Sequence, residues 1–383
     1  MTYSLKLPPV AHAGIGSLGV LRDAAVASGA KNILVCTDQG IEKSGLLDKV
    51  MEQVNGLDAA VQVLDTLTAE PSYLEVEENL NKIQGKPELI VGLGGGSVMD
   101  AAKLFSVLVG ADYTIRDLLE DSTKAKKMAK TIMIPTTCGT GAEATCNAIV
   151  AVPEKSVKIG IVSSEMIPDM ALLEPEMIRR LPKSIIAATG VDALAHVVEC
   201  FTSNKANPFS DTFAIQGAKL ILQHIVRAYT NPDDMEAKEA MMVGAYYGGV
   251  AITASGTTAV HALSYPLGGK FHIAHGVSNA ILFVPVMKMN QEACQDRLAQ
   301  LCEMVYEETV SMGAQERADF LIGRIGQVVR ETEIPTDLSA FGVTRKDLDF
   351  LVEAGSQQKR LLNNNRKQLT LEEIRSIYEE VVR

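Results

Sequence analysis

Residues 88–100 read ELIVGLGGGSVMD, and this stretch decides the fold. The apolar run predicts a buried β-strand that ends at three consecutive glycines, 94–96. Ser97 and Asp100 then have the spacing of a capping box, with Asp in place of Glu, which predicts that a helix begins here. Glycines let a diphosphate approach the backbone, and a helix start offers it free N–H groups. We therefore predict an anion site; the alternative is a plain strand-to-helix turn, which seldom needs three glycines.

The same alternation extends over the first ~180 residues. Apolar runs predict strands at 31–38, 60–64 and 131–135, and helical periodicity covers 75–83 and 98–109. Strands that alternate with helices indicate a parallel, Rossmann-like sheet. Helical patterns dominate afterwards, over 187–202, 211–229, 235–254, 291–308, 315–331 and 371–382. We predict an α/β dinucleotide-binding domain over 1–177 and an all-α domain over 178–383.

Composition excludes several classes of protein. Of the 383 residues, 47% are hydrophobic and 22% are charged, which is a globular balance rather than a disordered one. The net charge of −11 argues against nucleic-acid binding. No run approaches the ~18 apolar residues that a membrane helix needs. The first residues lack the apolar core of a signal peptide, so we expect a cytoplasmic protein. The six cysteines form no C-x-x-C pair and are expected to be free thiols.

Three further segments bear on a nucleotide. Residues 14–19 match G-x-G-x-x-G, but residues 8–13 make a poor central strand, so we favour a turn that enters a helix. Residues 135–143, PTTCGTGAE, follow a strand and offer hydroxyls, although Thr and Gly also make ordinary turns. Asp38 ends a strand, where it suits a ribose diol and repels a 2′-phosphate, favouring NAD over NADP. Alternatively, Asp38 caps the following turn.

The helical half carries a sharper signal for a metal. Asp192 and His196 are four residues apart, so a helix projects both from one face. His261 and His275 follow. One carboxylate and three imidazoles suit Fe(II), Zn(II) or a similar ion, and such a set can leave room for a substrate oxygen. Judged from spacing alone, the alternative is that these histidines are buried core residues that bind no metal.

In chain order, these motifs resemble the iron-containing (group III) alcohol dehydrogenase family. The four that carry the resemblance are Gly94-Gly95-Gly96-Ser97-x-x-Asp100-x-x-Lys103, Pro135-Thr136-Thr137-x-Gly139-Thr140-Gly141-x-Glu143, Gly190-x-Asp192-Ala193-x-x-His196, and His261-x(13)-His275-Gly276. Asn207-Pro208-x-x-Asp211 is similar too. The matches run from about residue 14 to 280. The resemblance implies a dehydroquinate synthase-like architecture with a cleft between its two domains.

The resemblance also assigns residues by position. It implies that Asp192, His196, His261 and His275 bind the metal, Fe(II) with Zn(II) as the alternative. It implies that NAD is bound through Asp38, Gly94, Gly95, Gly96, Ser97, Asp100, Thr136, Thr137, Thr140, Thr145, Asn147 and Lys158. Within that set Asp100 supports the glycine turn, and the early turn at 14–19 is peripheral.

The chain departs from the family pattern at Tyr265. Many members carry a second histidine there, four residues after the ligand at 261. A tyrosine with an ordinary pKa near ~10 relays protons poorly at pH 7, so we expect Tyr265 to orient the substrate. His-x-x-Ser-Tyr-Pro resembles branches that act on hydroxyacids. His272 is a candidate proton relay, or a histidine that only supports the site or lies on the surface.

The resemblance implies an NAD(H)-dependent alcohol dehydrogenase or aldehyde reductase. Hydride would pass between nicotinamide C4 and a small primary alcohol or hydroxyacid whose oxygen is bound to the metal. The alternatives are a hydroxyacid–oxoacid transhydrogenase-like enzyme, a dehydroquinate-synthase-like or glycerol-phosphate dehydrogenase-type enzyme, and a non-catalytic NAD-binding protein. Only Lys270 lies beside the ligand segments, which counts against a phosphorylated substrate. A homo-oligomer, a dimer or larger, is expected from the family.

Overall fold

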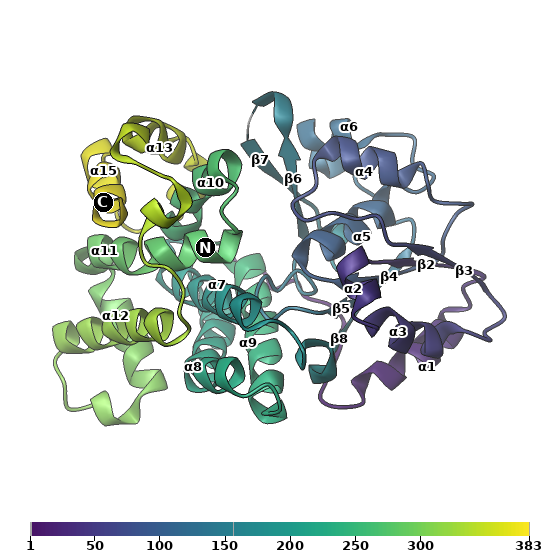
Figure 1. The fold of residues 1–383 in the computed structure, drawn as a ribbon, viewed down its shortest axis with the longest axis horizontal. Helices are drawn as coiled ribbons and strands as arrows, with labels where there is room; N and C mark the ends of the chain where they lie inside the picture. The colour runs from purple at the N-terminus through teal and green to yellow at the C-terminus, as the bar shows by residue number, and fades with distance from the viewer. Residues whose placement is uncertain (1, 156, 383) are drawn as a thin grey trace. The chain divides into compact units, whose positions relative to one another are not determined.

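The computed structural model describes residues 2–155 and 157–382, which form two compact units (Figure 1). Lys6–Leu181 make up the first unit. The second unit contains the residues from Pro182 onward and also the amino-terminal residues up to Leu5. We call them the α/β unit and the helical unit.

A parallel six-stranded sheet forms the centre of the α/β unit. Its spatial order is β1-β8-β5-β4-β2-β3, and every neighbouring pair is parallel. The chain moves outward from β2 to β3 and in the other direction from β4 to β5, so the order reverses between β2 and β4. The strands are β1 (Val10–Ala13), β2 (Asn32–Cys36), β3 (Ala60–Leu64), β4 (Leu89–Gly94), β5 (Lys130–Pro135) and β8 (Met170–Leu173).

Helices cover both faces of this sheet, as the continuous apolar strands require. Alternate residues of β2 enter two separate cores: Leu34 packs with residues of α4, α5 and α6, and Val35 packs with residues of α1 and α3. The helices are α1 (Val20–Ser28), α2 (Gln39–Lys43), α3 (Leu46–Val54), α4 (Tyr73–Leu80), α5 (Gly96–Leu108) and α6 (Ile115–Glu120). The predicted fold class is confirmed. An antiparallel hairpin of β6 (Asn147–Val152) and β7 (Val157–Val162) was not predicted.

The predicted capping box at the start of α5 is wrong. Gly95 is the N-cap and the helix begins at Gly96, so Ser97 already lies in the first turn. The Ser97 hydroxyl instead accepts a hydrogen bond from the N–H of Glu70 at 2.9 Å. The Asp100 carboxylate accepts one from the N–H of Ile149 at 2.9 Å. The Ser97 and Asp100 side chains therefore connect the start of α5 to the loop at Glu70 and to strand β6 rather than capping the helix.

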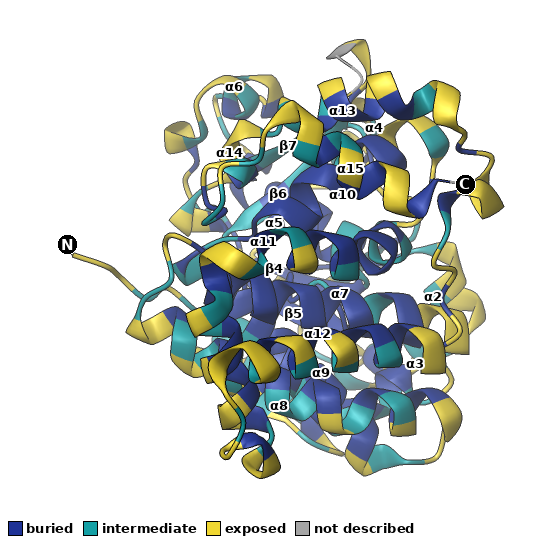
Figure 2. Ribbon diagram, turned by 90° about the vertical axis from the view of Figure 1, so that its left-hand side faces the viewer, coloured by how far each residue is buried: buried dark blue, intermediate teal, exposed yellow. Residues whose placement is uncertain are grey.

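The second unit is mostly helical, as predicted (Figure 2). The segment predicted at 291–308 overlaps the later part of a longer helical segment, 275–305, which continues through Pro285 and is kinked at Cys294, where the backbone is not helical. The main helices are α7 (Lys183–Thr202), α8 (Pro208–Thr230), α9 (Met235–Ala254), α10 (Ala259–Phe271), α11 (His275–Val305), α12 (Ala314–Glu331), α13 (Leu348–Ser356), α14 (Lys359–Leu362) and α15 (Leu371–Val381). Helix α7 is long and apolar enough to cross a membrane, but almost all of it is buried in the protein as a core helix.

Candidate active site

Three of the predicted nucleotide-binding segments lie at the same edge of the sheet. Cys36 of β2 pairs with Gly92 of β4, and Gly94 pairs with Pro135 of β5. Asp38, the glycine turn and the threonine-rich loop therefore follow three adjacent strands at their carboxyl ends. This edge also contains the reversal of strand order, where open α/β sheets bind their ligands.

Close packing explains two of the three glycines. A Cβ atom on Gly94 would lie 2.6 Å from the Cβ of Val98, and one on Gly96 would lie 2.7 Å from the Cγ2 of Thr140. At Gly95 the nearest atom, on Thr137, would be 3.5 Å away, an ordinary contact. Packing therefore demands glycine at 94 and 96, whereas Gly95 has room for a methyl group and must be explained in another way.

Two backbone N–H groups of the early glycine turn already donate hydrogen bonds to a side chain of the protein. The buried Glu174 carboxylate accepts hydrogen bonds from the N–H groups of Gly16 at 2.8 Å and Leu18 at 3.1 Å. A diphosphate would compete with this carboxylate for the same donors. The segment 14–19 enters the short helix before α1, which confirms its interpretation as a turn.

A buried lysine holds the loop that follows β5. The Lys103 ammonium donates to the Ala142 carbonyl and the Thr145 hydroxyl, both at 3.0 Å, and pairs with Asp100 at 2.8 Å. It also donates to the Asn147 carbonyl at 2.5 Å. Thr145 and Asp100 are thus engaged with Lys103 in a scaffold beneath the glycine turn.

Other predicted nucleotide-binding residues have different surroundings. Asp38 caps α2 by accepting from the N–H groups of Gly40 at 2.7 Å and Ile41 at 3.0 Å, the alternative role considered above. Lys158 pairs with Glu70 at 2.7 Å. Thr136 is buried and its N–H bonds to the Gly94 carbonyl at 3.0 Å. The hydroxyl of Thr140 accepts from the N–H of Ala142 at 3.2 Å, and Thr137 is half-buried.

The four predicted metal-binding residues converge in the helical unit. Asp192 and His196 lie one turn apart on α7, His261 lies on α10, and His275 is the first residue of α11. The Asp192 Oδ1 atom lies 3.8, 3.5 and 3.7 Å from the Nε2 atoms of His196, His261 and His275. Asp192, His196 and His261 are buried, and His275 is half-exposed.

Gly276 permits this convergence. A Cβ atom at this position would lie 2.3 Å from the backbone oxygen of Ala188 on α7. Only glycine lets the first turn of α11 approach α7 so closely, and this approach brings His275 to Asp192. The glycine after the last histidine of the motif is therefore a packing requirement.

Two buried polar residues of this cluster escaped sequence reasoning. Asn279 donates from Nδ2 to Asp192 Oδ1 at 2.6 Å, and the same nitrogen lies 3.2 Å from Nε2 of both His261 and His275. Glu199 contacts the Nδ1 atom of His261 through Oε2. Spacing offered a signal for both, because Glu199 lies two helical turns after Asp192 and Asn279 one turn after His275.

Burial and charge shift the acid–base behaviour of the cluster. Burial acts to raise the pKa of Asp192, but the surrounding histidines outweigh it and the pKa is lowered. Burial lowers the pKa of His196 to about 4, so this imidazole is neutral at pH 7. Burial also acts to lower the pKa of His261, but Glu199 and Asp192 outweigh it and raise the pKa to about 9.

The two predicted catalytic residues lie in different surroundings. The Tyr265 ring is centred 5.9 Å from that of His275, beside the cluster. Burial raises the pKa of Tyr265, and Arg360 acts to lower it. His272 is exposed and ends α10 in a left-handed conformation with φ of 54°. Tyr265 thus lies beside the cluster, whereas His272 is exposed at the end of a helix.

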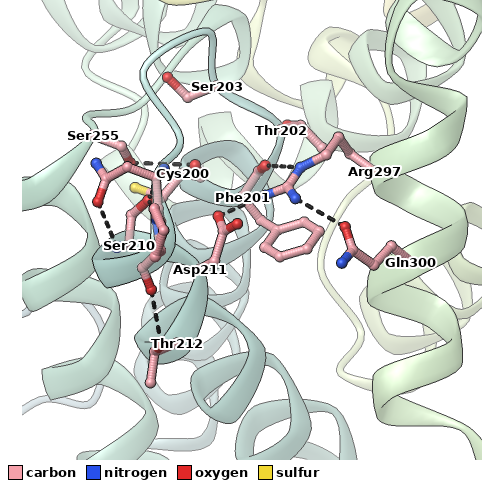
Figure 3. Close-up of polar contacts among 12 residues, drawn as sticks. Cys200, Phe201, Thr202, Ser203, Ser210, Asp211, Thr212, Ser255, Arg297 and Gln300 are labelled. Atoms are coloured by element: carbon pink, nitrogen blue, oxygen red, sulfur yellow. Dashed lines mark hydrogen bonds and ion pairs between the residues drawn. The ribbon is translucent and has the colours of Figure 1, made fainter. Parts of the chain in front are cut away.

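The motif Asn207-Pro208-x-x-Asp211 has a structural explanation. The Asn207 side chain caps α8 by accepting from the N–H groups of Phe209 and Ser210. Asp211 pairs with Arg297 at 2.5 Å, and Arg297 also donates to the Phe201 carbonyl at 3.0 Å (Figure 3). Arg297 therefore connects the end of α7, the first turn of α8 and α11.

Two family models match nearly the whole chain. Residues 8–175 match the model of iron-containing alcohol dehydrogenase, and residues 186–382 match that of the Fe-containing alcohol dehydrogenase family, C-terminal. The chain belongs to the iron-containing alcohol dehydrogenase family. Membership supports an oxidoreductase activity, and the resemblance seen in the sequence is confirmed.

The relatives below match over at least 95% of their length. The chain is 36% identical to long-chain-alcohol dehydrogenase 1 of Geobacillus thermodenitrificans (strain NG80-2), covering 98% of this chain and 95% of that protein. The solved structure of 1,3-propanediol oxidoreductase aligns with a TM-score of 0.94 at 26% identity, over 100% of both chains. Sulfoacetaldehyde reductase from Bifidobacterium kashiwanohense, solved in complex with NAD+, aligns with a TM-score of 0.88 at 27% identity, over 100% of this chain and 99% of that one.

Proposed function

We propose that the protein is a metal-dependent NAD(H) alcohol dehydrogenase or aldehyde reductase. Its substrate would be a small primary alcohol or hydroxyacid and the corresponding carbonyl compound. The observation that carries this proposal is the buried cluster of Asp192, His196, His261 and His275. We further propose that residues 1–177 bind the nucleotide and residues 178–383 bind metal and substrate.

Three of the four side chains, those of Asp192, His261 and His275, offer ligand atoms that all lie within 4.8 Å of one another, and His196 lies beside them. Ligand atoms held at 2.0–2.2 Å around a tetrahedral ion lie roughly 3.4 Å apart. The distances from Asp192 Oδ1 to the three Nε2 atoms, 3.5 to 3.8 Å, are close to that spacing. One carboxylate with three imidazoles suits Fe(II) and equally Zn(II). We therefore propose these four residues as the ligands, with Fe(II) favoured by the family.

The remaining groups of the chain bind and orient. When bound, NAD(H) exchanges a hydride and the divalent ion acts as a Lewis acid toward the substrate oxygen. Gly95 offers a backbone approach for the diphosphate at the start of α5. Asp38 is proposed to accept from the ribose diol, alongside its capping role. Tyr265 is proposed to orient the substrate through its hydroxyl, because its raised pKa makes it a poor base near pH 7.

Arg360 favours a carboxylated substrate as the second candidate. Arg360 lies on α14, and its charge acts to lower the pKa of the Tyr265 hydroxyl, the group that we propose to orient the substrate. A carboxylate is the natural partner of a guanidinium. A carboxylated substrate would place the protein among the family branches that act on hydroxyacids, including transhydrogenase-like enzymes. Arg360→Gln is expected to raise the KM for 4-hydroxybutyrate and to leave the KM for a neutral diol unchanged.

Turnover with defined metals tests the proposal. The protein is stripped of metal, and Fe(II) or Zn(II) is added back anaerobically while NADH absorbance is followed. The substrates are short aldehydes and diols together with succinic semialdehyde and 4-hydroxybutyrate. Turnover that depends on metal supports the proposal, and restriction to the carboxylated pair favours the second candidate. No turnover despite a bound metal would favour the lyase-like or non-catalytic alternatives.

Two expectations about the whole protein remain proposals. We expect a homo-oligomer, a dimer or larger, and a cytoplasmic location. Sedimentation velocity of the purified protein tests the first expectation, and a monomer at micromolar concentration would contradict it. Cell fractionation of the source organism tests the second.

A further inference from the structure

Glu199 is a fully buried carboxylate with four contacts. Its Oε1 atom accepts from the hydroxyl of Thr258 at 2.6 Å and from the N–H groups of Thr258 and Val260 at 3.2 and 2.7 Å. Its Oε2 atom contacts the Nδ1 atom of His261. One carboxylate thus caps the start of α10 and contacts a proposed metal ligand two residues further along that helix.

The two ring nitrogens of His261 have different partners. An ionised carboxylate only accepts hydrogen bonds, so Nδ1 must carry a proton to bond to Glu199. On the other side of the ring, Nε2 lies 3.2 Å from the Asn279 amide nitrogen and 3.5 Å from Asp192 Oδ1. The Asn279 NH₂ group has two protons and lies near three acceptors, Asp192 Oδ1 and the Nε2 atoms of His261 and His275, so it does not by itself fix the protonation of His261 Nε2. The contact with Glu199 places a proton on Nδ1, and in a neutral ring this leaves the Nε2 lone pair available to a metal.

We infer that Glu199 is a positioning residue that holds His261 in the Nδ1–H tautomer, with the Nε2 lone pair directed at the metal-binding cluster. This inference rests on the proposed function, because it requires a metal at these four residues. A carboxylate behind a histidine ligand fixes the orientation of the ring and makes its free nitrogen a better donor to a metal.

The variant Glu199→Gln tests the effect of Glu199 on the His261 tautomer separately from its capping of α10. The glutamine oxygen can still accept from Thr258 and Val260, which preserves the start of α10. Its NH₂ group then faces His261 Nδ1 and can only donate to it. This arrangement favours a proton on Nε2, the nitrogen that the metal needs. We therefore expect weaker metal binding with little change in fold.

Metal affinity is the readout, measured on the full-length protein without turnover. Co(II) binding is followed by its visible absorption, and the Zn(II) affinity is measured by competition with a chromophoric chelator. Glu199→Gln is expected to weaken both by roughly 10- to 100-fold, the range for partners of metal-ligating histidines. NADH binding, followed by fluorescence, is expected to stay at the wild-type value.

Two control variants are matched to Glu199→Gln. Glu174→Gln alters another buried carboxylate that accepts backbone N–H groups but lies in the α/β unit. Thr258→Val removes a donor to Glu199 and leaves the carboxylate against His261. Both are expected to bind metal as the wild type does. Wild-type affinity in Glu199→Gln overturns the inference alone, whereas a wild type that binds neither ion overturns the proposed function and the inference together.

A spectroscopic measurement does not depend on the variant folding. In ¹⁵N-labelled wild-type protein loaded with Zn(II), long-range ¹⁵N–¹H correlation spectra report the tautomer of each histidine. The His261 signals are assigned by their loss in His261→Gln. A proton on Nδ1 supports the inference, and a proton on Nε2 overturns it.

Discussion

The α/β unit and the helical unit expose their chemistry in different ways. Around Gly94–Gly96 the groups available to a ligand are backbone N–H groups at the start of a helix. The Lys103 side chain supports the neighbouring loop through hydrogen bonds. In the helical unit the candidate site instead consists of four side chains from α7, α10 and α11. A ligand site formed by backbone groups is weakened when a methyl group is added at a glycine. A site formed by side chains is weakened when one of those side chains is removed.

Removal of a ligand should produce the largest effect. Asp192→Ala is expected to lower metal-dependent kcat by more than ~100-fold, because changes to outer partners alone cost 10- to 100-fold. NADH binding should remain near the wild-type value, since it depends on the other unit. Turnover and NADH fluorescence titrations check this separation. Retained turnover in both Asp192→Ala and His261→Ala would show that the ligand assignment is wrong.

A buried carboxyl in the α/β unit should make stability depend on pH. Burial raises the pKa of Glu143 from 4.5 to about 7. A raised folded-state pKa means that stability is fully present below pH 4.5 and is lost as the pH rises through about 7, by roughly 3 kcal/mol at most. Glu143→Gln should remove this loss.

Urea unfolding at pH 5 and pH 8 measures the effect. The matched control is Glu52→Gln, which changes an exposed glutamate on α3 and should keep the wild-type pH dependence. Identical pH dependence in Glu143→Gln and the wild type would show that Glu143 is not a buried acid in solution.

Alanine variants at Gly94 and Gly95 should distinguish a glycine required for packing from a glycine required for the approach of a ligand. Gly94→Ala places a methyl group 2.6 Å from the Val98 Cβ, and overpacking of this kind costs about 1–3 kcal/mol of stability. Gly95→Ala has an ordinary contact at 3.5 Å and should change stability by less than ~0.5 kcal/mol. Thermal unfolding and NADH titration of both variants test the difference. Unchanged NADH affinity in Gly95→Ala would argue against a diphosphate at this backbone.

Tyr265→Phe should have the smallest effect. A residue that only orients the substrate is expected to change kcat by less than ~10-fold, whereas a general acid or base contributes 10²–10⁴-fold. Measurement of kcat and KM with the best aldehyde decides between these roles. A loss of 100-fold or more would make Tyr265 a proton-transfer group.

The sequence predicts the fold well because the fold depends on local spacing, and the same spacing places two of the proposed metal ligands together. The strand, turn and helix at 88–100 lie side by side in the chain, and Asp192 and His196 occupy one helical face. Capping at α5 was mispredicted because one residue of difference in the helix start changes the role of Ser97. The early part of α11 was missed because Pro285 is an interior proline, a residue that ordinarily ends a helix.

The residues that sequence reasoning missed are defined by long-range contacts. Glu199 contacts His261, 62 residues later, and Asn279 contacts Asp192, 87 residues earlier. A glutamate on a helix is usually a solvated residue, so its pattern alone does not indicate burial against a histidine. Spacing places Glu199 and Asn279 on the same helical faces as the proposed ligands, and the packing of α7 against α10 and α11 shows which residues they contact.

The chain crosses between the two units twice, after Leu5 and again after Leu181. A gene fragment that begins at Pro182 therefore encodes an incomplete helical unit, because it lacks the short leading segment that contains Tyr3, whose ring packs edge-on against Phe209 at 5.6 Å. A protease that nicks the chain at the second crossing leaves this segment on the other fragment, as a strap.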